Sequence, residues 1–449
     1  MSLESYPKYR DSGVEWLGEV PELWEVKPLK YLASINDKTL PETTEPDFEL
    51  EYVDIGGVSF GKGITATEKM VFENAPSRAR RVVKHGDTIV STVRTYLRAI
   101  SPINSPPGNL VVSTGFAVVR PRKIEPGFLA YAMQELSFVE SVVARSVGVS
   151  YPAVNASDIG DISIPQPKPD EQRAIADFLD AQTAKLDALM DKKRALIEKL
   201  KEKRSALISR AVTRGLDPDA PMRPSGIDWL ESIPRKWTAA KIWIHRVSRN
   251  IELQDGNHGE LHPKSEDYRS TGIPFVMANY LDRGHIDFDR CNFIEKEQAD
   301  SLRIGFAKEG DVLLTHKGTV GRVGVVQKSE FPYVMLTPQV TYYRCLKVVL
   351  NRFLRWQFEG QFWLDQLKLT GGQGSTRAYV GLLDQKTLHV LMPPMAEQIE
   401  IANYLDKETV KFDQMIDAVE RVLDKLDEYR SALITAAVTG KLDVRKTAA

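Results

Sequence analysis

An internal repeat constrains the fold of this chain more than any other feature, because a duplicated sequence has to form the same structure twice. Residues 171–217 align without a gap with residues 397–443, and 23 of the 47 paired positions are identical. A second match lies upstream of each segment, where Ser12-Gly-Val-Glu-Trp16 corresponds to Ser225-Gly-Ile-Asp-Trp229. The repeat predicts the order globular unit, long helix, globular unit, long helix.

The two aligned segments predict long helices that pair with each other. Residues 171–214 and 397–439 contain no Gly or Pro, and apolar residues recur in adjacent rows at a spacing of seven. Such rows are typical of a coiled coil, although they also occur on ordinary core helices. The residues predicted to pair the helices are Ile175, Leu179, Leu186, Leu189, Leu196, Leu200 and Leu207 in the first, and Ile401, Leu405, Phe412, Met415, Val422, Leu426 and Leu433 in the second.

Charge favours pairing of the two helices within one chain. Residues 171–214 carry a net charge of +4 and residues 397–440 a net charge of −5, and opposite charges favour this partner choice. Each helix is ~60 Å long at ~1.5 Å per residue. The second globular unit connects the end of one helix to the start of the other, and it is too compact to return that distance. We therefore expect antiparallel helices, with the globular units at opposite ends of a rod.

Prolines mark the domain boundaries. Residues 162–169 and 388–394 are strand-like segments that end in prolines, which cannot lie inside the helix that follows. The predicted segments are a first globular domain at 1–168, a helix at 169–214, a second globular domain at 215–394, and a helix with a C-terminal tail at 395–449. Strand-like runs at 87–92, 110–120 and 311–315 and short helices at 128–134 and 351–358 predict a mixed α+β fold for both domains.

Composition excludes several classes of protein. The chain has 449 residues, is 42% hydrophobic and carries a net charge of −1, so it can build an ample core and its bulk charge indicates no nucleic-acid partner. No apolar run is long enough to span a membrane, and the N-terminal residues do not form a hydrophobic targeting segment. Cys291 and Cys345 are too few for a disulfide framework or a zinc site. We expect a cytoplasmic protein without a membrane partner.

Motifs for catalysis are missing from the sequence. It contains neither the G-x-x-x-x-G-K-[ST] loop nor a G-x-G-x-x-G loop between a strand and a helix. Ser105-Pro-Pro-Gly108 resembles the catalytic tetrapeptide of amino-methyltransferases, but Gly108 stands where an aromatic ring is needed. His258 and His262 are four residues apart without the H-E-x-x-H pattern. We expect a chain that is not an enzyme and that binds no metal or cofactor of its own.

Clusters of basic and polar residues recur at equivalent places in the two globular units. A loop that leaves a strand with Lys, Arg, Thr and Tyr suits DNA, because cations contact phosphates and Arg can donate two hydrogen bonds to guanine. A solvated surface without a ligand is the alternative for each cluster. The candidate DNA-binding residues are Lys62, Arg78, Arg80, Arg81, Arg94, Tyr96, Arg98 and Tyr151 in the first unit, and Lys264, His316, Lys317, Thr319, Arg322, Gln373, Arg377 and Tyr379 in the second.

The chain resembles the specificity (S) subunits of type I restriction–modification systems over essentially its whole length. The resemblance lies in the opening Tyr9-Arg-Asp-Ser-Gly-Val-Glu-Trp16, the Gly-Asp strands at 86–87 and 310–311, the Pro-x-Pro and Glu-Gln residues that begin each helix, and the closing Arg-Ser-Ala-Leu-Ile segments. It implies that the globular units are two target-recognition domains, each of which reads one half of a bipartite asymmetric DNA site, and that the helices are the spacer.

The same resemblance implies partners and cofactors. Two methylating M subunits and the restricting R subunits would assemble with the chain, and S-adenosylmethionine, ATP and Mg would belong to those subunits. The alternative function is a coiled-coil scaffold that holds proteins together without sequence-specific DNA binding.

Overall fold

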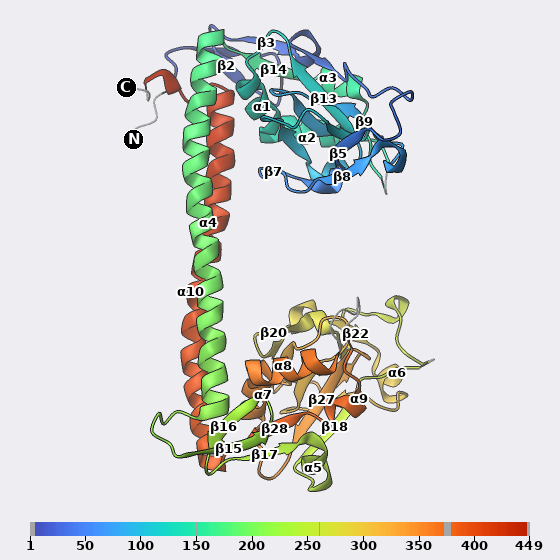
Figure 1. The fold of residues 1–449 in the computed structure, drawn as a ribbon, viewed down its shortest axis with the longest axis vertical. Helices are drawn as coiled ribbons and strands as arrows, with labels where there is room; N and C mark the ends of the chain where they lie inside the picture. The colour runs from blue at the N-terminus through green and yellow to red at the C-terminus, as the bar shows by residue number, and fades with distance from the viewer. Residues whose placement is uncertain (1–4, 149–150, 260, 372–378, 447–449) are drawn as a thin grey trace. The chain divides into compact units, whose positions relative to one another are not determined.

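The computed structural model describes residues 5–148, 151–259, 261–371 and 379–446. Contacts divide the chain into two compact units (Figure 1). Unit 1 comprises Met1–Lys193 and Arg421–Ala449, and unit 2 comprises Arg194–Glu420. The division crosses both long helices, so each unit contains one globular region and parts of both helices. The four-segment domain division stays a prediction.

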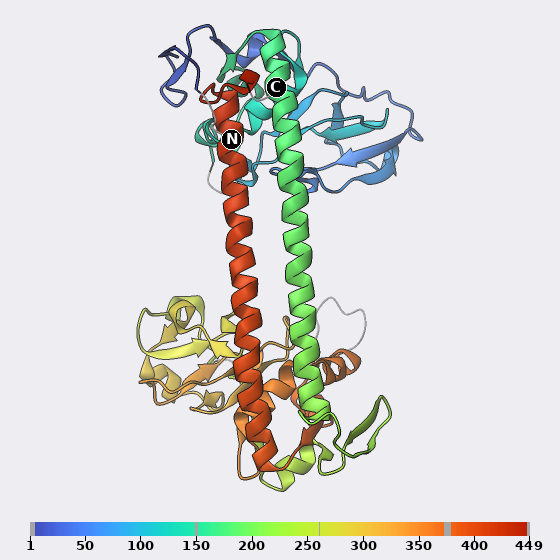
Figure 2. The same cartoon turned by 90° about the vertical axis from the view of Figure 1, so that its left-hand side faces the viewer.

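Two long helices, α4 (Pro169–Arg214) and α10 (Met395–Val438), contribute to both units. In unit 1, Ile175 and Leu179 near the start of α4 share a core with Leu433 near the end of α10. In unit 2, Ile208 near the end of α4 shares a core with Ile401 near the start of α10. The helices therefore run antiparallel in each unit (Figures 1 and 2), and the predicted antiparallel pairing is confirmed.

Prolines and acidic residues fix where α4 begins. Pro169 is its first residue, a position where the missing N–H costs nothing. Asp170 and Glu171 lie in the first turn, where negative charge interacts favourably with the helix dipole. Before α10, the carbonyl of Pro394 accepts a hydrogen bond from the N–H of Gln398.

Unit 1 contains two four-stranded sheets. The first is antiparallel throughout and follows the order β11 (Ile100–Pro102), β10 (Thr88–Ser91), β13 (Phe116–Pro121), β4 (Ala33–Ile35). The second follows the order β8 (Glu68–Val71), β5 (Glu49–Val53), β12 (Leu110–Ser113), β9 (Ala79–Val82), and its β5–β12 pair is parallel. All residues of β10 and β12 are buried, so these strands form the centre of the domain.

Unit 2 repeats this topology. Its antiparallel sheet follows the order β18 (Ile251–Asp255), β27 (Val340–Cys345), β24 (Val312–Thr315), β25 (Val323–Val325). Its second sheet follows the order β22 (Asn292–Ile294), β19 (Ile273–Val276), β26 (Val334–Leu336), β23 (Phe306–Ala307), again with a parallel central pair, β19–β26. The same strand order and the same parallel pair confirm the duplicated α+β fold.

Short elements connect the sheets to the long helices in both units. The helices are α1 (Pro126–Gln134), α2 (Leu136–Ala144) and α3 (Ala156–Gly160) in unit 1, and α5 (Ile242–Val247), α6 (Lys296–Asp300), α7 (Asn351–Glu359), α8 (Gln361–Thr370) and α9 (Leu382–Gln385) in unit 2. The two-stranded pairs are β1 (Tyr9–Asp11) with β2 (Glu19–Pro21), β3 (Glu25–Pro28) with β14 (Ser163–Gln166), β6 (Val58–Ser59) with β7 (Gly63–Ile64), β15 (Met222–Ile227) with β16 (Leu230–Pro234), β17 (Thr238–Lys241) with β28 (His389–Met392), and β20 (Leu281–Asp282) with β21 (His285–Ile286).

A second tryptophan, eight residues after the one that ends the repeated N-terminal motif, packs against the long helices in each unit. Trp24 and Trp237 are each 1% exposed, and they lie in the cores that contain α10 and α4 residues. A guanidinium from the preceding strand donates to the carbonyl of each tryptophan, from Arg10 in unit 1 and Arg223 in unit 2. The opening motif therefore attaches the globular region to the helices.

The buried face of each long helix differs from the predicted heptad rows. The predicted residues Leu189, Leu196, Met415 and Val422 are 40–53% exposed, whereas the residues Met190, Ile197 and Ile416, which were not predicted, are 3–6% exposed. The prediction that these four exposed residues lie in the helix interface is therefore corrected. The other predicted pairing residues are buried or half-buried: Ile175, Leu179, Leu186, Leu200, Leu207, Ile401, Leu405, Phe412, Leu426 and Leu433.

The period of the helices explains the correction. An α-helix has about 3.6 residues per turn, so eighteen residues make about five turns and place Ile197 in line with Leu179. Leu196 precedes Ile197 by one residue and is turned about 100° away. On a straight helix, residues spaced strictly by seven rotate about 20° per repeat away from one face. Later members of the predicted rows therefore turn away from the partner helix.

Candidate nucleic-acid interface

The aspartate of each Gly-Asp strand anchors the base of a candidate loop. Asp87 is 1% exposed, and its two carboxylate oxygens accept from Arg120 on β13 at 2.9 and 2.7 Å. It also accepts from the backbone N–H of Lys84 at 2.8 Å. A buried carboxylate in a bidentate ion pair with a guanidinium fixes the start of β10. The loop that follows β10 therefore begins at the end of a rigid strand.

Unit 2 contains the same anchor. Asp311 is 2% exposed and accepts from Arg344 on β27 at 2.9 and 2.7 Å. The N–H of Lys308 donates to the same carboxylate at 2.8 Å. The Gly-Asp motif thus has a structural role in both copies of the repeat.

Two loops meet at the end of β10 in unit 1. We call residues 92–98 with the described residues of 146–154 loop pair 1. Val93 and Ala153 form an antiparallel bridge, and the N–H of Arg94 donates to the carbonyl of Pro152 at 2.8 Å. The hydroxyl groups of Thr95 and Ser146 are 2.7 Å apart. Backbone pairing at one end and a side-chain hydrogen bond at the other hold the loops together.

Four predicted DNA-binding residues lie on the exposed side of loop pair 1. Arg94, Tyr96, Arg98 and Tyr151 are all exposed, and the tyrosine side chains are 56% and 68% exposed. The Arg94 guanidinium lies 5.1 Å from the centre of the Tyr151 ring. Tyr96 and Arg98 make no side-chain hydrogen bond or ion pair with any residue that the structure describes. The loop pair therefore presents two cations and two aromatic rings to a ligand.

Arg94 and Arg98 have strained backbones. Their φ angles are 51° and 50°, in the left-handed region that side chains other than glycine rarely adopt, and they flank the 3-10 turn Thr95–Leu97. Gly318 occupies the position equivalent to Arg94 in unit 2 and has a φ of 77°. Because glycine adopts this conformation without strain, the arginine at position 94 is retained at a conformational cost.

Unit 2 brings together the equivalent residues. We call residues 316–322 with Tyr379 and Val380 loop pair 2. Lys317 and Tyr379 form an antiparallel bridge at the positions equivalent to Val93 and Ala153. Lys317, Thr319, Arg322 and Tyr379 are exposed, and the N–H of Arg322 donates to the hydroxyl of Thr315 at 2.9 Å. Both units therefore present a polar loop pair at the end of the Gly-Asp strand.

His316 does not belong to the exposed surface of loop pair 2, which corrects the prediction. Its side chain is 1% exposed, and its Nε2 lies 3.6 Å from a carboxylate oxygen of Asp255. Burial holds the pKa of His316 below its ordinary value, and the nearby carboxylate opposes this shift. The ring packs beside Tyr379, with 5.7 Å between ring centres.

Three arginines predicted to bind DNA contact their own domain. Arg78 pairs with Asp54 at 3.0 Å and donates to the Tyr52 hydroxyl at 3.1 Å. Arg80 lies 4.5 Å above the Phe72 ring. Arg81 is half-buried and its Nη1 donates to Thr39 at 3.3 Å. A DNA-binding role for these three stays a prediction, and their intramolecular contacts favour a structural role.

The remaining predicted residues lie outside the loop pairs. Lys62 is exposed in the turn between β6 and β7, and Lys264 is exposed in the loop before the 3-10 turn Ser265–Asp267. Gln373 and Arg377 lie outside the described residues.

Sequence reasoning missed residues that orient the loops. Arg120 and Arg344 hold the Gly-Asp carboxylates, and their recurrence at a shift of 224, the shift of the Gly-Asp motif itself, could have identified them. Val147, at 81% exposed, and Leu97, at 43% exposed, add apolar surface beside the cations of loop pair 1.

The residues that the structure describes contain no group of three or more His, Cys, Asp or Glu side chains arranged to hold a metal ion. Among their helices, none is both long and apolar enough to cross a membrane.

The chain is similar to known proteins of one kind. A family model described as "Type I restriction modification DNA specificity domain" matches residues 21–199. The specificity subunit of the type I restriction enzyme EcoKI from Escherichia coli K12 is 23% identical over 72% of this chain and 68% of its own length. The chain is a homologue of type I restriction enzyme specificity subunits. Its relatives are thus specificity subunits and not the modification or restriction subunits of such enzymes.

Other relatives of this specificity-subunit homologue extend the likeness along the chain. The EcoBI specificity subunit from Escherichia coli is 22% identical, over 68% of this chain, and the match spans 64% of that subunit, slightly less than two thirds. The MjaIX specificity subunit from Methanocaldococcus jannaschii is 20% identical over 96% of both chains. A chain solved in a study of complex assembly and conformational transition of the type I R-M system has a TM-score of 0.69, at 21% identity over 94% of this chain and 99% of that one. That likeness shows a shared fold.

Proposed function

We propose that this chain is the DNA-recognition subunit of a type I restriction–modification complex and that it reads a bipartite, asymmetric DNA site. Loop pair 1 reads one half-site and loop pair 2 reads the other. The chain itself performs no reaction, because its role is to position partner subunits on the DNA.

The observation that carries the proposal is the recurrence of an exposed polar loop pair at equivalent places in two copies of one fold. A bridge between equivalent residues closes each pair, Val93 with Ala153 and Lys317 with Tyr379. Some side chains of the two loops differ, with Arg94 and Tyr96 in one copy and Gly318 and Val320 in the other, whereas Arg98 and Arg322 are the same residue at equivalent positions. The same backbone arrangement with partly different side chains suits two modules that read different base sequences.

The proposed partners supply the chemistry. Two M subunits bind one chain, because the duplication offers two equivalent sets of surfaces, and R subunits join the assembly. S-adenosylmethionine, ATP and Mg belong to those subunits. The relation to specificity subunits supports this assignment.

Methylome sequencing of a host that carries the M partner, with and without this gene, tests the proposal. We expect a gapped motif that is methylated only when the gene is present. A matched pair of variants then tests the residues. Arg98→Ala should lower methylation of the motif by weakening recognition of one half-site. Lys236 is an exposed cation in the turn between β16 and β17, and Lys236→Ala should leave methylation unchanged. Methylation that is independent of the gene would instead support a scaffold without sequence-specific DNA binding.

A further inference from the structure

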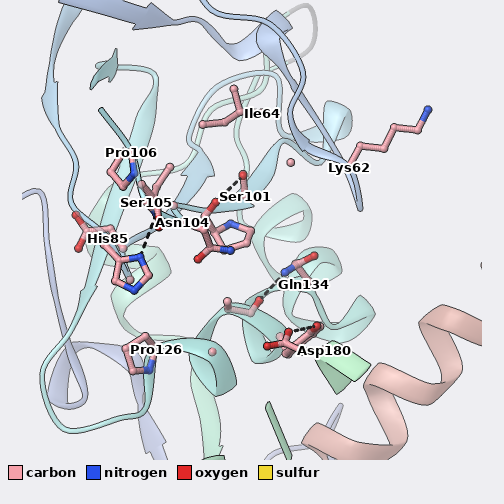
Figure 3. Close-up of a pocket in the computed structure, with 18 of the residues that line it drawn as sticks. Lys62, Ile64, His85, Ser101, Asn104, Ser105, Pro106, Pro126, Gln134 and Asp180 are labelled. Atoms are coloured by element: carbon pink, nitrogen blue, oxygen red, sulfur yellow. Dashed lines mark hydrogen bonds between the residues drawn. The ribbon is translucent and has the colours of Figure 1, made fainter. Parts of the chain in front are cut away.

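Unit 1 contains an open cavity of 680 Å³ between α1, the β6–β7 hairpin and the long helices (Figure 3). Figure 3 shows Gln134 and Asp180 together at one end of this cavity, with the Lys62 amino group directed away from them. Ala130, Asp187 and Arg430 also line the cavity, and Arg430 pairs with Asp187 at 3.4 Å. We call these five residues, Ala130, Gln134, Asp180, Asp187 and Arg430, the acidic end of the cavity. It lies apart from the loop pairs and is not used in the proposed function.

The internal repeat shows which residues of unit 2 occupy the equivalent place. The N–H before α1, from Glu125, donates to Gln172 at 2.7 Å, and the N–H before α7, from Leu350, donates to Gln398 at 2.8 Å. Residues of α1 therefore correspond to residues of α7 at a shift of 225.

Further contacts recur at the acidic end itself. The repeated contacts are Tyr131 with Asp180 at 2.6 Å and Trp356 with Asp406 at 2.7 Å, and Arg430 with Asp187 at 3.4 Å and Arg204 with Asp413 at 3.0 Å. The two units thus build the same frame of one aromatic ring, two aspartates and one arginine.

Unit 2 fills this frame with a guanidinium. Arg355, the residue equivalent to Ala130, has a side chain that is 10% exposed and pairs with Glu359 at 2.8 Å. It donates to the carbonyl of Arg283 at 2.9 Å and lies 3.4 Å from the centre of the Trp356 ring. A Cβ atom on Gly284 would lie 2.2 Å from this guanidinium, so the β20–β21 hairpin closes directly onto it. Arg355 lines a smaller cavity of 410 Å³, and its partner Glu359 lines another of 340 Å³.

Unit 1 lacks one cation and one anion of this arrangement. Ala130 stands in place of Arg355, and Gln134 stands in place of Glu359. The two aspartates are retained, and the side chain of Asp187 is 52% exposed where its equivalent, Asp413, is 22% exposed. The acidic end of the cavity therefore carries two carboxylates against the single charge of Arg430. Glu51 and Glu125 line the same cavity and add negative charge.

We propose that this cavity binds a guanidinium group in the place that Arg355 occupies in unit 2. The guanidinium belongs to an arginine side chain of a partner polypeptide or to free arginine. Its planar fork would donate to Asp180 and to the amide oxygen of Gln134, the equivalents of the Asp406 and Glu359 groups beside Arg355, and would stack on the Tyr131 ring. A guanidinium makes these interactions better than an ammonium. The proposal does not depend on DNA recognition.

Calorimetric titration of the full chain with ethylguanidinium tests the chemistry of the site. We expect saturable binding that is at least about tenfold tighter than binding of butylammonium, a difference of about 1.4 kcal/mol. Blocked arginine, with acetylated amine and amidated carboxyl, should bind as tightly as ethylguanidinium if the ligand is a polypeptide side chain. Tighter binding of free arginine than of blocked arginine would instead identify the free amino acid as the ligand. Equal affinity for guanidinium and ammonium, or no saturation by either, would overturn the proposal.

Two matched variants locate the binding. Ala130→Arg with Gln134→Glu gives unit 1 the residues of unit 2, so it should fill the site and remove ethylguanidinium binding. Arg355→Ala with Glu359→Gln gives unit 2 the residues of unit 1, so it should add a second site to the titration. Unchanged stoichiometry in both variants, with the folded state verified by circular dichroism, would contradict the assignment.

Discussion

Replacing Arg355 by alanine tests how the globular region of unit 2 is attached to its long helix. The guanidinium contacts the carboxylate of Glu359 at 2.8 Å, lies 3.8 Å from that of Asp406 on α10, and donates to the carbonyl of Arg283 at 2.9 Å. Burial lowers the pKa of Arg355, and the carboxylates of Glu359 and Asp406 oppose that shift. In the variant, Glu359, whose side chain is 14% exposed in the intact protein, keeps Arg204 at 3.4 Å as its ion-pair partner.

The magnitude follows from this burial. Removing one partner of a buried ion pair costs about 3–5 kcal/mol, because the other charge stays desolvated. A unit of this size loses about 2–4 °C of Tm per kcal/mol. Arg355→Ala should therefore lower the Tm of unit 2 by about 6–20 °C, as measured by differential scanning calorimetry.

Two comparison variants separate charge from packing. Arg352→Ala removes an arginine that pairs with Asp406 but is 45% exposed, so it should cost less than about 1 kcal/mol. Arg355→Ala with Glu359→Gln removes the stranded carboxylate as well and should recover a large part of the loss, since the same combination exists in unit 1 as Ala130 and Gln134. If the double variant were no more stable than Arg355→Ala, the account based on an unpaired buried charge would be refuted.

Three further predictions concern the loop pairs and the helices. In competition binding of the assembled complex, Arg98→Ala should weaken only one half-site and Arg322→Ala only the other, by about 1–3 kcal/mol for a lost base contact; equal loss at both half-sites would contradict two separate modules. Arg94→Gly should leave the unfolding free energy unchanged or raise it by about 1 kcal/mol, because glycine adopts a φ of 51° without strain, while it reduces the salt dependence of DNA binding; a less stable protein would show that the side chain packs against the fold. Met190→Ala should lower the free energy of unfolding, measured by chemical denaturation, by about 2–5 kcal/mol. Leu189 is 41% exposed, so Leu189→Ala should lower it by less than about 1 kcal/mol. Similar losses in the two variants would support the predicted heptad rows instead.

Repetition made much of the fold predictable from the sequence. The identity between residues 171–217 and 397–443 indicated two long helices, and the structure begins and ends them at Pro169, Arg214, Met395 and Val438. Net charges of opposite sign indicated that the helices pair with each other. These features were readable because helix formation and pairing depend on local patterns of charge and apolar residues.

Side-chain contacts across the domain could not be predicted in the same way. The sequence placed His316 beside Lys317 in a polar loop, yet burial of His316 depends on Asp255 and Tyr379, which come from distant strands and loops. The same holds for Arg78, which pairs with Asp54 across the sheet. An exposed cation and a paired one look identical in a sequence, since only the tertiary fold supplies the partner.

The helix rows show a second kind of limit. The apolar residues Leu189 and Met190 are adjacent, so either could face the partner helix, and the small difference between periods of 3.5 and 3.6 residues decides which one does. That difference accumulates slowly, which is why the predicted rows agree with the structure near Leu179 and fail by Leu196.

The way in which α10 completes unit 1 sets an order of events during synthesis on the ribosome. The core around Trp24, Ile175 and Leu179 also contains Leu433 and Val438, and these emerge some 240 residues after Lys193. At translation rates of about 5–20 residues per second, the first unit waits for tens of seconds with apolar surface uncovered. Unit 2 is continuous in sequence, from Arg194 to Glu420, and has all its residues before unit 1 is complete. The core of the first unit is therefore completed only when the last helix of the nascent chain emerges.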